Sequence, residues 1–141
     1  MGRILCAVRG GEESKKTQTE AIALAKKRGD SLIFLYVVDL HFLDKTAAPI
    51  LVDVEDEVGD MGEFLLLMAK ERADEQGVET RVIRRKGKVR PEIKKAAIEE
   101  DVSLVVLGAP IGKDCAFHHA ELEAFALEVE EETGVKTEIV C

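Results

Sequence analysis

The chain has 141 residues and a formal net charge of −8 at pH 7. Its length predicts one globular domain spanning residues 1–141, and its acidic balance with only 4% aromatic residues argues against a nucleic-acid partner, because the mean field repels phosphate and stacking residues are few. Three scattered cysteines without a CxxC pair, and no apolar stretch of membrane-spanning length, predict a reduced, cytoplasmic protein without a membrane partner.

Strand-like and helix-like patterns alternate through the first half of the chain. Unbroken apolar runs are typical of strands buried on both faces, and apolar residues three and four positions apart are typical of amphipathic helices. These patterns predict, in order, a strand at 4–8, a helix at 14–28, a strand at 32–38, an acidic connection at 39–57 and a helix from 58 to 77.

The second half continues the alternation. A strand with interspersed polar residues is expected at 78–85, and Pro91 suits the first turn of the helix that follows it, with Ile93, Ala97 and Ile98 as its apolar residues. A further apolar run and an alternating final run predict two more strands. The remaining elements are a strand at 102–107, a helix whose apolar face holds Leu122, Phe125, Ala126 and Val129, and a strand at 135–140.

Five strands that alternate with four helices predict an α/β fold, in which a parallel sheet carries helices on both faces. Strands one, two and four are apolar throughout and should be central, whereas strands three and five carry charges and should be edges. The Rossmann-like strand order 3-2-1-4-5 satisfies both conditions. It creates a topological switch point between strands one and four, and small ligands bind outside the carboxyl ends of strands at such a point.

The ends of strands one and four, with the segments that follow them, are therefore the candidate binding site. Both segments hold glycines, and each holds one cation, Arg9 or Lys113, so the pair suits a small anion. The candidate binding residues are Ala7, Val8, Arg9, Gly10, Gly108, Gly112 and Lys113.

Three stretches of the chain resemble the universal stress protein family, and together the resemblance covers essentially the whole sequence. They are the opening strand and turn at 4–14, the end of the second strand at 36–39, and the stretch 87–108, which begins GKVRPEI. The family's fold, adenine nucleotide alpha hydrolase-like, has the five-stranded order predicted above.

The resemblance also implies a homodimer. The final strand is expected to leave one edge of the sheet open, and an open edge pairs readily with another strand. Family members commonly dimerise through this strand, which implies pairing here through Val135, Thr137 and Ile139.

Many members of the family bind ATP through a loop after strand four, with the pattern Gly, two residues, Gly, nine residues, Gly, then Ser or Thr. Here Gly108 is followed by Gly112, one residue late, and Leu122 stands where the third glycine belongs. Arg9 stands where an Asp is common, and Val38 has the position that would offer backbone groups to an adenine edge.

The departures from this pattern imply a non-catalytic, stress-response regulatory dimer with a degenerate nucleotide pocket and no fixed cofactor. The alternative is a genuine ATP-binding member with slow ATPase or switch behaviour. A nucleotidyl-transfer enzyme on a similar fold is a remote third hypothesis, since the chain lacks the histidine signature of such enzymes.

Two other motifs have simpler structural interpretations. The segment 108–113 resembles a Walker A loop, but three residues instead of four separate its glycines and Asp114 follows the lysine, which favours a plain strand-to-helix turn. Cys115, His118 and His119, with His41, offer soft metal ligands at a spacing that matches no familiar zinc pattern, which favours a polar loop.

The net charge conceals two segments of opposite sign. Residues 114–132 hold seven acidic and no basic residues, whereas residues 81–95 hold eight basic residues and one acidic residue. We interpret the basic segment mainly as a solvated edge strand that is protected by its charge. The alternative is a surface that attracts an acidic partner or a phosphate. The run of apolar residues at 64–68 predicts a helix that is buried and also contributes to a subunit contact.

Overall fold

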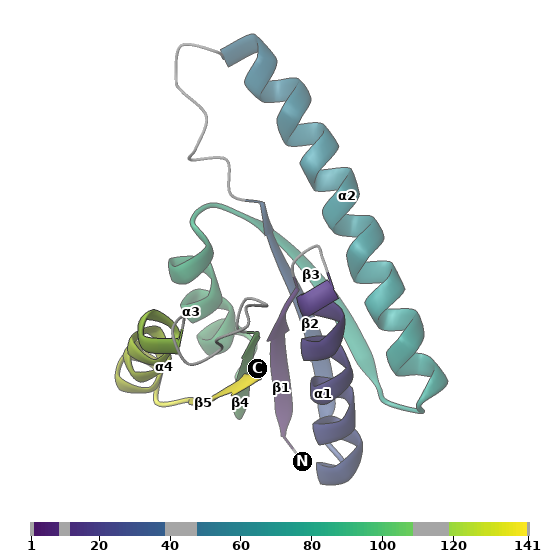
Figure 1. Cartoon of the computed structure of the whole chain (residues 1–141), viewed down its shortest axis with the longest axis vertical. Helices are drawn as coiled ribbons and strands as arrows, with labels where there is room; N and C mark the ends of the chain where they lie inside the picture. The colour runs from purple at the N-terminus through teal and green to yellow at the C-terminus, as the bar shows by residue number, and fades with distance from the viewer. Residues whose placement is uncertain (1, 9–11, 39–47, 109–118, 141) are drawn as a thin grey trace.

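The computed structural model describes residues 2–8, 12–38, 48–108 and 119–140, and the side chains of 2–8, 15–38, 62–108 and 123–140. It confirms the predicted α/β fold, with a parallel sheet in the order β3-β2-β1-β4-β5 (Figure 1). The strands are β1 (Arg3–Ala7), β2 (Ser31–Val38), β3 (Thr80–Lys86), β4 (Leu104–Gly108) and β5 (Lys136–Val140). The helices are α1 (Glu12–Arg28), α2 (Ala48–Glu75), α3 (Val89–Glu99) and α4 (His119–Thr133).

The alternation of side chains along the central strands builds one core on each face of the sheet. In β1, Ile4 and Cys6 face the core shared with α1 and α2, whereas Leu5 between them faces the core shared with α3 and α4. All three side chains are completely buried. Strands buried on both faces need the unbroken apolar runs that the sequence shows, so the helix pairs α1/α2 and α3/α4 lie on opposite faces (Figure 1).

Helix α2 corrects one prediction. It begins at Ala48 and has 28 residues, so much of the expected acidic connection at 39–57 is helical. Pro49 is the second residue of α2. The N–H groups of a helix's first turn have no acceptor within the helix, so a proline is compatible with this position and does not break the helix. The lower part of α2 packs against β2 and β3, and its upper part extends past the end of the sheet (Figure 1).

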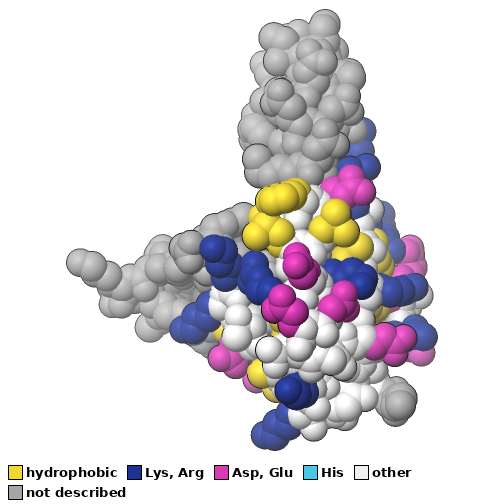
Figure 2. Space-filling model, turned by 90° about the vertical axis from the view of Figure 1, so that its right-hand side faces the viewer, with side chains coloured by type: hydrophobic (Ala, Val, Ile, Leu, Met, Phe, Trp, Pro, Cys, Tyr) yellow, Lys and Arg dark blue, Asp and Glu magenta, His cyan; other side chains and the backbone are white. Residues whose placement is uncertain are grey.

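The apolar run at 64–68 divides between the core and the surface. Leu66 is buried, but Phe64 and Leu67 are 62% and 55% exposed. Figure 2 shows this side of the molecule, with hydrophobic side chains grouped above a mixture of basic and acidic ones. A similar correction applies to α3, where Ile93 and Ala97 are buried as predicted but Ile98 is exposed, because it lies on the outward side of the helix.

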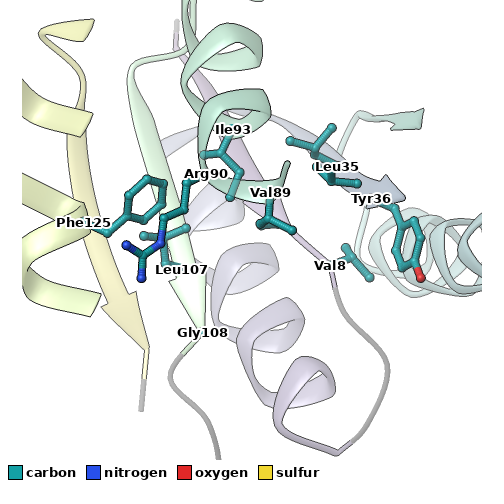
Figure 3. A pocket seen from close by; sticks show the side chains of 11 residues that line it. Val8, Leu35, Tyr36, Val89, Arg90, Ile93, Leu107, Gly108 and Phe125 are labelled. Carbon is teal, nitrogen blue, oxygen red and sulfur yellow. The ribbon is translucent and has the colours of Figure 1, made fainter. Parts of the chain in front are cut away.

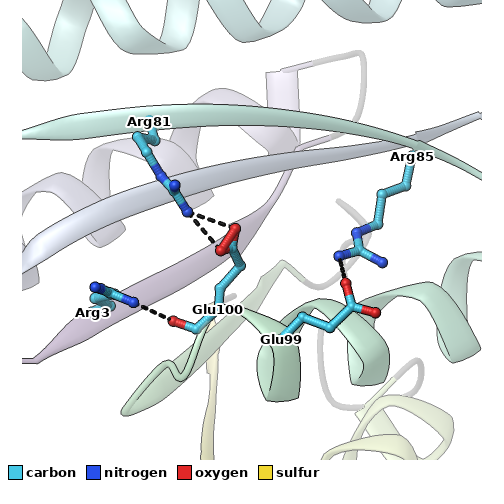
Figure 4. A network of polar contacts seen from close by, with 5 residues as sticks. All are labelled: Arg3, Arg81, Arg85, Glu99 and Glu100. Atoms are coloured by element: carbon cyan, nitrogen blue, oxygen red, sulfur yellow. Dashed lines mark hydrogen bonds and ion pairs between the residues drawn. The ribbon is translucent and has the colours of Figure 1, made fainter.

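The basic edge strand β3 is fastened to α3 by ion pairs and not simply solvated. Arg81 Nη2 lies 2.6 Å from Oε1 of Glu100, whose backbone oxygen accepts a hydrogen bond from Arg3 Nη1 at 2.8 Å (Figure 4). Arg85 pairs with Glu99, and the Arg85 guanidinium holds the pKa of this carboxyl below its ordinary value, chiefly through the hydrogen bond. Much of the positive charge at this edge is therefore matched by carboxylates at the C-terminal end of α3.

Candidate functional site

A cavity of about 300 Å³ opens at the carboxyl ends of β1, β2 and β4, at the topological switch point (Figure 3). The first turn of α3 forms one wall, and the ring of Phe125 on α4 contributes another part of the lining. Most of the lining is apolar, which is typical of small-molecule sites with few orienting polar groups. The lining residues are Ala7, Val8, Leu35, Tyr36, Val37, Val89, Arg90, Ile93, Leu107, Gly108 and Phe125.

Arg90 brings a positive charge to this cavity from α3. Its guanidinium carbon lies 5.4 Å from the centroid of the Phe125 ring, a distance at which a cation and an aromatic ring attract each other. Figure 3 shows the side chain reaching from the first turn of α3 toward Phe125 and Leu107 near the end of β4. Phe125 is only 4% exposed, so the ring that meets the guanidinium is fixed in the core.

Lys94, one turn further along α3, has a different environment. Its ammonium nitrogen lies 2.8 Å from Glu128 Oε1 and 2.6 Å from Glu132 Oε2, and also 6.0 Å from the Phe125 ring centroid. Hydrogen bonds to the two carboxylates raise the pKa of Lys94, and the same contact lowers the pKa of Glu128. Lys94 therefore joins α3 to the acidic helix α4.

Two glycines near the cavity allow neighbouring elements to pack closely. A Cβ atom at Gly108 would stand 2.1 Å from Thr17 Oγ1, so β4 can approach α1 this closely only without a side chain. A Cβ atom at Gly62 would stand 2.2 Å from the Tyr36 ring, so α2 likewise leaves space for that ring. Desolvation raises the pKa of Tyr36 above its ordinary value.

The candidate residues from the sequence fall into three groups. Ala7, Val8 and Gly108 line the cavity. Val38 ends β2 and its backbone oxygen accepts a hydrogen bond from Gly87 N at 3.0 Å, while the neighbouring Val37 is the residue that lines the cavity. The other four candidates, Arg9, Gly10, Gly112 and Lys113, lie outside the described residues.

Sequence reasoning missed the contribution of α3 and α4 to this cavity. Arg90 was one of eight basic residues in the segment 81–95, and Phe125 was assigned to a helix face without a role in binding. Pro91 was an available signal, because a proline typically stands in the first turn of a helix. It marks the N-terminal end of α3, which is the end that lines the cavity.

The described lining of the cavity holds few groups with acid–base or nucleophilic chemistry. Among the described lining residues there is no carboxylate, histidine or thiol, so no acid, base or nucleophile of these types faces the ligand space. Cys6, within β1, is fully buried, and burial raises the pKa of its thiol to about 12, which makes it unreactive.

The described residues also bear on metal binding and on membrane insertion. No group of three or more His, Cys, Asp or Glu side chains there could hold a metal ion, and the histidine and cysteine candidates of 115–119 fall outside the described side chains. In the same part of the chain, no helix combines the length and apolar character needed to cross a membrane.

Comparisons with known proteins agree with this fold. The family model described as "Universal stress protein family" matches residues 1–111. Universal stress protein YxiE of Bacillus subtilis is 31% identical over 123 residues, which cover 76% of this chain and 78% of that protein.

Solved structures extend the agreement to nearly the full length. Universal stress protein UspA from Lactobacillus plantarum matches with a TM-score of 0.81 and 18% identity, over 99% of this chain and 97% of that one. A family member from Burkholderia pseudomallei matches with a TM-score of 0.72 and 23% identity, over 99% and 95% of the two chains. The family match and the sequence relative together establish that this chain belongs to the universal stress protein family.

Proposed function

We propose that this protein is a non-catalytic regulatory member of its family, and that its switch-point cavity takes a purine nucleoside carrying one phosphate. The observation that carries the proposal is the apolar cavity of about 300 Å³ with Arg90 as its one described charged lining residue. A cavity of this size lies at the lower end of the range for small-molecule sites, which suits a single nucleoside better than an extended ligand.

Two structures of similar fold support the choice of ligand. One is a universal stress protein in complex with cAMP, which matches with a TM-score of 0.71. Another is the universal stress protein from Archaeoglobus fulgidus in complex with dAMP, with a TM-score of 0.66. Both ligands are adenine nucleotides with a single phosphate, and we extend that ligand class to this cavity by proposal.

The sequence after β4 supports a single phosphate over three. A triphosphate needs several backbone amides in a glycine-rich loop, because glycines permit the close approach of backbone to phosphate. The late Gly112 and the replacement of the third glycine by Leu122 remove this pattern from the chain. On this proposal, ATP should bind no more tightly than AMP.

Isothermal titration calorimetry with adenosine, AMP and ATP–Mg²⁺ tests the proposal. We expect measurable binding of adenosine and AMP, no gain from the two further phosphates of ATP, and no release of phosphate from ATP on prolonged incubation. ATP binding at least about a hundredfold tighter than AMP, a difference of about 2.7 kcal/mol, would instead support the alternative of a genuine ATP-binding member.

We also propose that the regulatory unit is a dimer paired through β5. This strand is the last in the sheet order, and Thr137 and Ile139 are only partly buried within the single chain. Thr137 N donates a hydrogen bond to Glu130 Oε1 at 3.0 Å, so pairing of two β5 strands would exchange this contact for a backbone hydrogen bond.

Sedimentation equilibrium with two opposing variants tests the dimer. Thr137→Pro should favour the monomer, because it removes the backbone N–H that faces the open edge of β5. Glu130→Ala should favour the dimer, because it removes the side chain that occupies Thr137 N. A wild-type protein that stays monomeric at all concentrations, or a dimer that neither substitution shifts, would contradict this assignment.

A further inference from the structure

We propose that Arg90 is the specificity-determining residue of the switch-point cavity, that it selects a ligand with one phosphate over its uncharged counterpart, and that Phe125 positions it. This inference rests on the proposed function and names the group that recognises the phosphate. It places phosphate recognition on α3, whereas the sequence had pointed to the segments after β1 and β4.

The first step of the argument is the place of Arg90. It is exposed and lies in the first turn of α3, yet it lines a cavity whose other described lining residues are uncharged. Its guanidinium extends toward the end of β4, beside Leu107 (Figure 3). A fork of N–H donors at this position suits a phosphate, since arginine binds phosphate oxygens through paired hydrogen bonds.

The second step is the difference between Arg90 and Lys94. Both cations lie near the face of Phe125, at 5.4 and 6.0 Å from its centroid. Lys94 is neutralised by Glu128 and Glu132. The charge of Arg90 acts on Glu128 and helps to lower the pKa of that carboxyl, but none of the ion pairs found among the described side chains includes Arg90, so its N–H donors remain available to a ligand.

The third step concerns orientation. An exposed arginine loses side-chain entropy when it binds a ligand. The buried Phe125 ring reduces this cost by holding the guanidinium beside the cavity before the ligand arrives. The attraction to the ring is not a hydrogen bond, so it leaves the N–H groups of the guanidinium able to donate to a ligand.

A purely structural role for Arg90 is the competing explanation. Lys94 already joins α3 to α4 through two carboxylates and meets the same ring, so Arg90 is not needed for this connection. A structural role would also change adenosine and AMP binding together, whereas phosphate recognition changes only the binding of AMP. This contrast provides the readout for the test.

The experiment measures the affinities of adenosine, AMP and inorganic phosphate by calorimetry for the wild type, Arg90→Gln and Arg90→Lys. Lys95→Gln is the matched control, because it removes one exposed charge from the same helix outside the cavity lining. Circular dichroism and thermal denaturation establish that each variant is folded. Repeating the AMP titration at raised ionic strength adds a second readout, because salt screens an exposed cation.

We expect Arg90→Gln to weaken AMP binding by about tenfold or more, the range for a lost charge-assisted hydrogen bond, with adenosine binding unchanged within about twofold. Arg90→Lys should restore part of the loss, Lys95→Gln should match the wild type, and the advantage of AMP over adenosine should decrease with salt.

Three results would overturn the inference. An equal loss for adenosine and AMP in Arg90→Gln would assign Arg90 a structural role. Equal affinities of the wild type for adenosine and AMP would show that no phosphate is recognised, while leaving a nucleoside site in place. If the wild type bound none of the ligands, or bound inorganic phosphate as tightly as AMP, the proposed function itself would be lost, and this inference with it.

Discussion

Two hollows on the described surface differ in kind, and the smaller of the two is the better candidate for a ligand. The switch-point cavity measures about 300 Å³, whereas a groove between α1 and α2 measures about 670 Å³. The groove is formed by α1, α2 and the turn that follows α2, and charged side chains such as Lys27, Arg72 and Glu75 line it. The cavity instead receives residues from three strands and two helices.

On the proposed function, strand topology indicates the ligand site better than the volume of a hollow does. At the switch point of a doubly wound sheet, the connections after two adjacent strands run to opposite sides of the sheet. This leaves a crevice outside the carboxyl ends of the strands, and several elements line it. A groove between two neighbouring helices has no such convergence, and Lys26 Nζ lies 3.5 Å from Gln76 Oε1 across it. The two hollows should therefore respond differently to the same kind of substitution.

The largest expected effect comes from filling each hollow in turn. Ala7→Leu adds bulk at the cavity lining and should weaken adenosine and AMP binding together by at least about tenfold, because the added side chain occupies the ligand's place. Ala23→Leu adds the same bulk to the groove and should leave both affinities unchanged. Calorimetry on the two variants measures both effects. Weaker binding in Ala23→Leu alone would instead place the ligand in the groove.

The next effect concerns the frame that holds the cavity open. Gly108→Ala should lower the free energy of unfolding by about 1–3 kcal/mol, the usual range for overpacking, because the new Cβ meets Thr17 Oγ1. Adding Thr17→Ala should recover part of this loss by removing the hydroxyl. Urea denaturation of the single and double variants measures both steps, and additive losses would show that the contact is not the cause.

Phe125→Leu tests whether the ring of Phe125 positions the Arg90 guanidinium at the cavity. The substitution keeps the site apolar but removes the ring under Arg90, so it should reduce the preference for AMP over adenosine by about 0.5–2 kcal/mol. Adenosine affinity should change much less than AMP affinity. An unchanged ratio of the two affinities would mean that Phe125 does not position the guanidinium.

The smallest expected effect concerns the ion pair at the β3 edge, whose residues line neither the cavity nor the groove. Arg85 lowers the pKa of Glu99, so the ion pair adds stability above the unfolded-state pKa and loses it as pH falls through the lower folded-state value. Arg85→Met should return the Glu99 pKa toward its ordinary value and reduce the acid dependence of stability. A carboxyl-detected NMR titration checks the shift, and AMP binding at neutral pH should be unaffected.

The sequence was sufficient to predict the strands and their order, because central strands are buried on both faces and must therefore be apolar. The apolar runs at 4–8 and 32–38 identified β1 and β2, and the charges of β3 identified an edge. The start of α2 was predicted too late because Pro49 and the neighbouring acidic residues read as a connection. Local composition did not separate a helix's first turn from a loop.

The site was only partly predictable for a related reason. The switch-point rule depends on strand order alone, and it led to Ala7, Val8 and Gly108. The approach of Arg90 to Phe125 depends on how α3 packs against α4, two helices whose contact residues are 35 positions apart in sequence. Residue spacing carries no information about that contact, so the guanidinium looked like any other charge in a basic segment.

The most direct test of the central claim maps the ligand on the protein by NMR. Titration of ¹⁵N-labelled protein with AMP should shift the backbone amides of Val8, Val37, Arg90 and Gly108, around the switch-point cavity. The amides of Thr19, Ala23 and Arg72 at the α1/α2 groove should stay in place. Shifts confined to the groove, or saturating AMP without any shift at the cavity, would contradict the account.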